Sequence, residues 1–190
     1  MKRKILLIFL SFSLMMVLIP QTSFAQTETP SISMQVTPTP SIALTVEYQL
    51  PYPGLLPDNA FYYLKTLRDK IVGFLISDPI KKAEFDLLAA DKRLNAASFL
   101  FEKGKYDLAL STISKGENYF EEAIEKTSVA KKEGRETTNI LIKLSASVKK
   151  HKEVLTSLGK KAPGNSKAGI ISSMKRLDGF ENQVNLLISR

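Results

Sequence analysis

The sequence predicts an all-α fold, an antiparallel bundle of about five helices. Three observations support this prediction. Apolar residues recur at spacings of three and four over most of the chain after residue 50, and each run fits one face of a helix. Gly, Pro and Asp separate these runs, as they do at helix boundaries. A chain of 190 residues has room for one such domain plus extensions.

Residues 1–25 have the features of a signal peptide. A basic start is followed by an apolar run from Ile5 to Ile19, and Ser23 and Ala25 supply the small residues of a cleavage site. We expect cleavage after Ala25 and an exported protein, extracellular or associated with the cell envelope. A retained anchor is the alternative, but 15 positions fall short of the roughly 20 that cross a bilayer. No membrane span is expected in the mature chain.

Residues 26–49 are rich in Thr, Ser and Pro and lack a helical apolar period. This composition is typical of a flexible linker. The segment 31–36 has a related copy at 41–46, and each places three apolar residues at every second position. A disordered tether is the preferred interpretation, and short strands that add to another protein's sheet edge are the alternative.

The helical domain is expected over residues 50–190. It begins with the proline-rich stretch 50–57, which should lie extended because proline restricts its own backbone and that of the residue before it. Tyr52, Leu55 and Leu56 are its expected buried anchors. Asp58 is the expected N-cap of a first helix over about 59–76. The apolar face of this helix consists of Phe61, Leu64, Leu67, Ile71 and Phe74.

The second and third helices carry the most regular pattern. Asp78 and Pro79 suit a helix start, and Gly104 after Lys103 suits a left-handed cap. Ala or Gly occupies alternate positions of much of the repeat, so we predict a close-packed antiparallel hairpin. The second helix contributes Ile80, Ala83, Leu87, Ala90, Leu94, Ala97 and Phe101, and the third, which Gly134 ends, contributes Ala109, Ile113, Gly116, Phe120, Ala123, Thr127 and Ala130.

Two further helices complete the expected bundle. A fourth is predicted over about 138–158, a turn over 159–165, and a fifth capped by Ser166. The fourth would bury Leu141, Leu144, Val148, His151, Leu155 and Leu158, and the fifth Ile170, Leu177, Phe180, Val184 and Leu187. The domain thus divides into a core at 50–132 and basic C-terminal helices at 136–190.

Composition excludes several kinds of site. The chain has no Cys and one His, which excludes thiol catalysis, disulfides and zinc–thiolate sites. His151 is interpreted as a core residue, because no second His or Cys can complete a transition-metal site with it. The carboxylates Glu117, Glu121 and Glu125 are interpreted as a solvated stripe, or as partners of the basic C-terminal half. No cofactor or metal is expected. The carboxylates that suit a glycosidase pair, Asp69, Asp78, Glu84, Asp86 and Asp91, lie at helix-pairing or capping positions.

Charge is unevenly distributed along the chain. Residues 26–125 carry a net charge of −4 and residues 126–190 a net charge of +9. The two halves either face each other, or the basic half meets an anionic polymer or anionic lipid. Nucleic acid is not expected as a partner of an exported protein. The candidate polyanion surface consists of Lys149, Lys150, Lys152, Lys160, Lys161, Lys175 and Arg176.

The stretch from about 50 to 125 contains a spaced set of motif residues, which are Tyr62, Leu64, Lys65, Asp78, Pro79, Ala83, Arg93, Leu94 and Gly104. With this set the stretch resembles a bacterial domain of unknown function, DUF family 5667, which often shows a Y-P-L-K, then D-P, then R-L pattern. Tyr63 stands where the family frequently has proline. The resemblance implies helices and an exported or membrane-anchored protein, and it implies no reaction.

We therefore expect a non-enzymatic helical module at the bacterial cell envelope, acting as a binding, scaffold or accessory sensor domain. An anionic envelope polymer is the first candidate partner. Another exported protein, received by the helices or by the proline-rich stretch, is the second. A carboxylate-dependent envelope hydrolase is the remote alternative.

Overall fold

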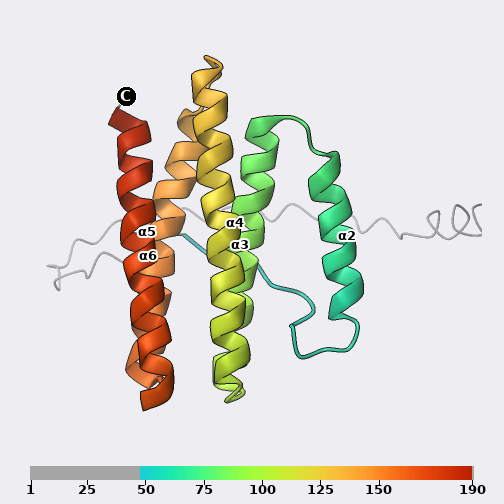
Figure 1. The fold of residues 1–190 in the computed structure, drawn as a ribbon, viewed down its shortest axis with the longest axis vertical. Helices are drawn as coiled ribbons and strands as arrows, with labels where there is room; N and C mark the ends of the chain where they lie inside the picture. The colour runs from blue at the N-terminus through green and yellow to red at the C-terminus, as the bar shows by residue number, and fades with distance from the viewer. Residues whose placement is uncertain (1–47, 190) are drawn as a thin grey trace, which may run out of the picture. The chain divides into compact units, whose positions relative to one another are not determined.

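A computed structural model of the protein describes residues 48–189. Within this range the chain forms five helices and no strand, and 81% of the described residues are helical, so the predicted all-α bundle is confirmed (Figure 1). The expected signal peptide and all but the last two residues of the expected linker lie outside the described residues. The helices are α2 (Tyr62–Leu75), α3 (Pro79–Glu102), α4 (Tyr106–Lys132), α5 (Thr138–Lys161) and α6 (Gly164–Ser189).

Helices α3 to α6 form a four-helix bundle of two antiparallel hairpins. The α3–α4 hairpin packs against the α5–α6 hairpin, chiefly through α3 on α5 and α4 on α6. Helix α2 stands apart at the edge of the bundle, beside α3 and on the side away from α5 and α6 (Figure 1). Among the helices it packs only on α3.

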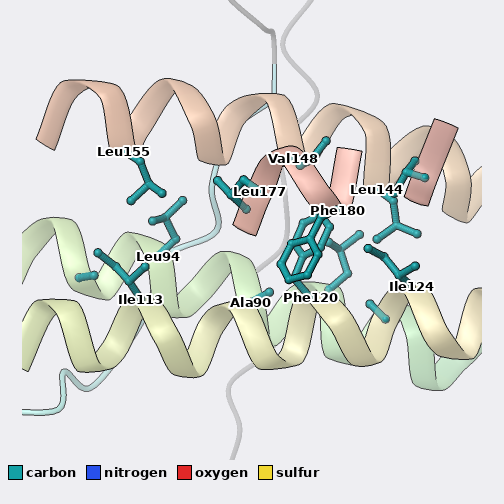
Figure 2. Packing of buried hydrophobic residues seen from close by; sticks show 14 of the residues in the cluster. Ala90, Leu94, Ile113, Phe120, Ile124, Leu144, Val148, Leu155, Leu177 and Phe180 are labelled. Carbon is teal, nitrogen blue, oxygen red and sulfur yellow. The ribbon is translucent and has the colours of Figure 1, made fainter. Parts of the chain in front are cut away.

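The core lies between the two hairpins (Figure 2). Phe120 of α4 and Phe180 of α6 stack with ring centroids 5.4 Å apart and planes 7° apart, and both rings are buried. In Figure 2, Val148 of α5 lies next to this aromatic pair, while Leu94 of α3 lies farther along the core, near Ile113 and Leu155. Every buried residue of the apolar core lies between 83 and 184, so α2 contributes none of them.

The boundaries of the α3–α4 hairpin agree with the sequence. The carboxylate of Asp78 accepts the amides of Ile80 and Lys81 at 2.9 and 3.0 Å, and Pro79 occupies the first turn. Gly104 adopts a φ of 71°, which a side chain disfavours, and so lets the chain reverse into α4. The predicted seam residues are buried, except Ile80, which is half-buried.

Close packing of the hairpin is clearest at Gly116. A Cβ at this position would lie 3.3 Å from the carbonyl oxygen of Ala90 and 3.2 Å from Cβ of Arg93. The backbones of α3 and α4 therefore approach each other where Gly116 has no side chain and Ala90 has only a methyl group.

Two predicted caps are wrong. Asp58 does not cap α2, which begins at Tyr62; its carboxylate accepts Lys103 and Lys105 at 3.1 and 2.9 Å, tying the N-terminal segment to the α3–α4 turn. Ser166 does not cap α6, because its amide already donates to the carbonyl of Pro163 and the helix begins at Gly164. The turn before α6 is thus shorter than expected.

Candidate functional site

Helix α2 contacts α3 through its polar side. The guanidinium of Arg93 donates to the hydroxyl of Tyr62 at 2.9 Å. In the last turn of α2, Gly73 is buried against Phe85, where a Cβ would lie 3.0 Å from the Phe85 ring. Asp69, on the same side of α2, is half-buried. The Arg93–Tyr62 hydrogen bond and the close contact at Gly73 therefore hold α2 on α3. No apolar side chain of α2 is fully buried.

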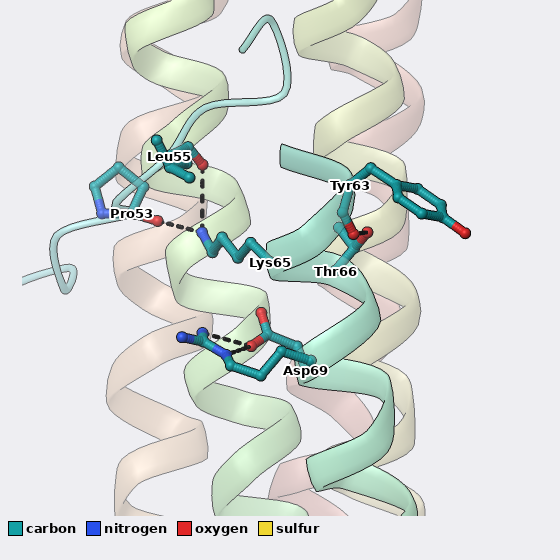
Figure 3. Close-up of polar contacts among 7 residues, drawn as sticks. Pro53, Leu55, Tyr63, Lys65, Thr66 and Asp69 are labelled. Carbon is teal, nitrogen blue, oxygen red and sulfur yellow. Dashed lines mark hydrogen bonds and ion pairs between the residues drawn. The ribbon is translucent and has the colours of Figure 1, made fainter. Parts of the chain in front are cut away.

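Lys65 fixes the N-terminal segment against α2 (Figure 3). Its ammonium donates to the carbonyl oxygens of Pro53 and, at 3.4 Å, of Leu55. Burial, assisted by the neighbouring cations Lys92, Arg93 and Arg68, lowers the pKa of Lys65, while Asp69 opposes this shift. Lys65 thus acts as a latch that positions the loop 53–57 beside the first turns of the helix.

The apolar side of α2 faces away from the bundle. The sequence correctly predicts that its apolar residues share one side, but the expectation that this side is buried in the bundle is wrong. Phe74 is 88% exposed and Leu75 is 70% exposed. In Figure 3 the Tyr63 ring projects from the side of α2 opposite to Pro53 and Leu55. We call this surface the outer face; its residues are Tyr63, Leu64, Leu67, Ile71, Phe74 and Leu75.

The expected anchors of the proline-rich stretch are also wrong. Tyr52 is 77% exposed, Leu55 is exposed and Leu56 is only half-buried, whereas Pro53 is buried and Leu50 packs on the core. The reason is that Lys65 binds the carbonyls of this stretch, which turns several of its side chains outward.

A hollow of about 470 Å³ lies where this stretch meets α2, and it contains three cations and no acid. We call it the cationic cup. It is contiguous with the outer face through Leu64. Its side chains come from Tyr52, Pro53, Leu55, Phe61, Leu64, Lys65, Arg68 and Lys92.

A second hollow, of about 610 Å³, runs between α2 and α4 over α3. Phe74, Phe85 and Tyr119 line it together with lysines and acidic residues in equal number. The charges that line this hollow therefore sum to zero, and they favour neither an anionic nor a cationic ligand. The lysines are Lys70, Lys82 and Lys126, and the acids Asp69, Glu122 and Glu133.

The bundle interior contains a polar cluster centred on Asp91. Its Oδ1 accepts Ser147 at 2.6 Å and lies 2.8 Å from Nε2 of His151, and its Oδ2 accepts the hydroxyl of Tyr48 at 2.6 Å. Burial, together with the Asp91 carboxylate, raises the pKa of Tyr48, so the hydroxyl remains a donor. The interpretation of His151 as a satisfied core residue agrees with this geometry; the ring also meets Phe120 edge-on.

Ser147, His151 and Asp91 are the residue types of a hydrolytic triad, but their arrangement differs from one. In a triad the histidine bonds the serine hydroxyl in order to accept its proton. Here both Ser147 and His151 bond the same oxygen of Asp91. All three residues are also buried, at 3% exposure or less. The cluster therefore links α3 to α5 and has the geometry of a structural network.

Ion pairs occupy part of the predicted polyanion surface. Lys150 pairs with Glu153, Lys152 lies 2.7 Å from Asp178 and from Glu181, and Arg176 bonds Glu117 and Glu121. Asp178 and Glu181 raise the pKa of Lys152. Among the described residues no ion pair involves the remaining members, which are Lys149, Lys160, Lys161 and Lys175. All four are exposed.

The acidic and basic halves of the chain meet within the bundle. Arg176 of α6 bridges to the predicted acidic stripe on α4, at 2.7 Å from Glu121. The candidate glycosidase carboxylates also have partners. Asp78 pairs with Arg135 and Glu84 with Lys143 across the two halves, Asp69 pairs with Arg68 and Asp86 with Lys82 within the acidic half, and Asp91 bonds His151. Burial raises the pKa of Asp86, whose Oδ2 has no partner among the described residues.

Two further features bear on the class of site. Across residues 48–189, no cluster of three His, Asp or Glu side chains is placed to hold a metal ion. The described helices include none that is both long and apolar enough to span a bilayer.

Most of the family-signature residues described here stabilise the fold, and one of them is exposed. Ala83 and Leu94 are buried in the α3–α4 seam, while Tyr62, Lys65 and Arg93 hold α2 and its loop in place. Leu64 is the exception, since it is exposed on the outer face. The sequence analysis does not assign a function to Arg68, Lys70 and Lys92. One signal could have pointed to this region, because α2 carries more apolar residues than a single neighbouring helix can cover.

Comparison with known proteins gives one family. Residues 54–165 match the family model described as Domain of unknown function (DUF5667). The match extends beyond the expected end at about residue 125 and includes α5. No curated protein and no solved structure matches the chain.

Proposed function

The chain belongs to the DUF5667 family, and from this premise we propose that it is an exported, non-enzymatic binding module whose contact surface is the outer face of α2. The family's description names no reaction. The one observation that carries the proposal is the orientation of α2, which places its polar side on α3 and leaves its apolar side uncovered by any residue from 48 to 189.

The size of the exposed apolar surface supports a binding role. Seven large apolar side chains of this 14-residue helix are exposed, and all but Val72 belong to the outer face. Tyr52 and Phe61 extend this surface into the cationic cup. Contiguous exposed apolar patches of this kind mark sites for proteins or membranes. Scattered exposed residues such as Ile142 on α5 form no such patch.

The orientation of α2 also has a local physical basis. Turning the helix over would bury its apolar side, but it would remove the Arg93–Tyr62 hydrogen bond and the Lys65 latch. It would also place bulky side chains where Gly73 now meets Phe85. The polar contacts therefore hold the apolar surface ready for a partner without a rearrangement of the bundle.

Site-specific crosslinking in exporting cells tests the proposal. The chain has no Cys, so Leu64→Cys and Phe74→Cys each provide a single attachment point for a photoreactive group. We expect specific adducts from both positions and none from Ile142→Cys, an equally exposed apolar site on α5. Equal adduct formation from α2 and α5, or none from α2, would contradict the proposal.

The basic surface on α5 and α6 is the second candidate. Lys149, Lys160, Lys161 and Lys175 remain exposed without a described ion pair, which suits an anionic envelope polymer. Retention of the protein on such a polymer should fall steeply with salt, and Lys149→Gln with Lys160→Gln should weaken it. Retention that survives this double change would remove the basic surface from consideration.

A further inference from the structure

The outer face of α2 and the cationic cup together fit an anionic lipid bilayer, and we propose that this surface docks the domain on such a membrane. The inference rests on the proposed function, because it names the partner of the same face. The apolar side chains enter the acyl region, and Arg68, Lys70 and Lys92 meet the lipid phosphates.

The arrangement of side chains around α2 matches a helix lying in a membrane interface. At 3.6 residues per turn, the outer face spans an arc of about 120°. Arg68 and Lys70 fall just beyond its two edges, and both are exposed. Long cationic side chains at the margins of an apolar face reach the headgroups while their stems stay in apolar surroundings.

The cationic cup provides a place for a headgroup. Lys65, Arg68 and Lys92 line it and no acid does. Burial lowers the pKa of Lys65, Asp69 opposes this shift, and the cations Lys92, Arg93 and Arg68 add to it. An anion held among Lys65, Arg68 and Lys92 reduces the repulsion between these cations. Tyr52 and Phe61 at the rim, both largely exposed, are suited to the boundary between headgroup and acyl chain.

The charge of α2 argues against a second copy of the chain as the occupant. A twofold contact brings identical patches together, so Arg68, Lys70 and Lys92 of one copy would approach the same cations of the other. The only acid of α2 is Asp69, and it already accepts Arg68 at 2.6 Å. An anionic surface supplies the opposite charge that a second copy lacks.

The expected route of the chain agrees with this partner. The apolar run Ile5–Ile19 predicts delivery to a membrane, and the linker 26–49 joins it to the helical domain. A bilayer is therefore the first large apolar surface that the exported domain meets. Interfacial docking requires no membrane span, in keeping with the described helices.

Vesicle flotation tests the inference with the chain from Gln26 onward, which lacks the expected signal peptide and retains the whole core. We expect binding to phosphatidylglycerol vesicles and little binding to phosphatidylcholine vesicles. Binding should weaken as ionic strength rises from about 0.01 to 1 M, because the Debye length falls from about 30 to 3 Å.

Two matched pairs of variants locate the contact. Ile71→Ser should lower affinity by about tenfold or more, since an apolar side chain no longer leaves water, while Ile142→Ser on α5 should leave it unchanged. Arg68→Gln with Lys70→Gln should lower affinity by about 25-fold, at roughly fivefold per cation. Lys149→Gln with Lys160→Gln removes the same charge from α5 and should have little effect.

Several outcomes would overturn the inference. Equal binding to both lipids would remove the anionic requirement, and equal effects of the α2 and α5 variants would remove the assigned surface. Failure to bind vesicles, with Leu64→Cys and Phe74→Cys still crosslinking to a protein in cells, would replace the membrane by a protein partner and leave the proposed function standing. Self-association lost on Ile71→Ser would identify a second copy as the occupant. No vesicle binding and no crosslinks would end both proposals.

Discussion

The guanidinium of Arg93 donates a 2.9 Å hydrogen bond to the hydroxyl of Tyr62, and the same group lies over the Tyr119 ring, 4.9 Å from its centroid. One side chain of α3 thereby contacts both α2 and α4. Because α3 is the only described helix on which α2 packs, this bond is a principal restraint on how α2 is rotated, and hence on which side of α2 faces the solvent.

Removal of the Tyr62 hydroxyl should loosen α2 without unfolding the bundle. Tyr62→Phe should speed amide hydrogen exchange in α2 by about tenfold, because a hydrogen bond to a charged group contributes about 1.5 kcal/mol. Exchange in α3 to α6 should not change. Tyr63→Phe is the control, since that ring is 71% exposed. Identical exchange in the two variants would mean that the Arg93 contact does not hold the helix.

Removal of Asp91 should destabilise the whole bundle. Asp91→Ala leaves Ser147, His151 and Tyr48 without their shared acceptor, and we expect a loss of about 3 to 5 kcal/mol in the free energy of unfolding. Denaturant unfolding followed by circular dichroism measures it. Glu102→Ala, at an exposed position, should change stability by no more than about 0.5 kcal/mol. A similarly small effect at Asp91 would rule out a structural role for the cluster.

The same substitution should have opposite effects at two glycines. Gly116→Leu should lower stability by about 1 to 3 kcal/mol, because a side chain there meets the backbone of Ala90. Gly179→Leu should raise stability by about 0.5 to 1 kcal/mol, because nothing lies within 4 Å of a Cβ there and leucine favours a helix over glycine. Thermal melting distinguishes the two. Ala90→Leu should resemble Gly116→Leu, and unchanged melting in both would refute the close-packed hairpin.

Asp78 should contribute to acid sensitivity. The ion pair with Arg135 and the amides of α3 lower the pKa of Asp78 below its ordinary value of 3.8. A carboxyl group with a lowered folded-state pKa stabilises the fold above its ordinary pKa, and this contribution disappears as the pH falls through the folded-state value. The melting temperature of the parent should therefore fall more steeply below pH 3.8 than that of Asp78→Ala. Parallel curves would show that the pair contributes nothing.

The sequence predicts the helices and the core well because both depend on local periodicity. Ala90 and Gly116 are recognisable as seam residues from spacing alone, and Asp78 and Gly104 from the chemistry of helix ends. The orientation of α2 depends instead on contacts between distant residues. Arg93 and Tyr62 are 31 positions apart, and His151 and Asp91 are 60 apart. Periodicity identifies the apolar side of α2 but does not indicate whether another helix covers it.

The predicted polyanion surface stays a prediction, but the pairing of its cations depends on the same kind of long-range contact. A run of lysines in the basic half suggests an anion-binding surface, yet Lys152 and Arg176 are held by acids that come from other positions in the folded chain. Net charge per segment does not reveal such pairing. The cationic cup combines residues from the proline-rich stretch, α2 and α3, and no single stretch of sequence displays it.

Helix α2 turns its apolar side away from the bundle, and thiol labelling of single-cysteine variants of the purified protein tests this orientation. Phe74→Cys should react about as fast as a cysteine in an unstructured peptide. Ala97→Cys, in the fully buried seam, should react at least about 100-fold more slowly, because its labelling requires opening of the bundle. Protection of position 74 to the level of position 97 would show instead that the apolar side of α2 is covered.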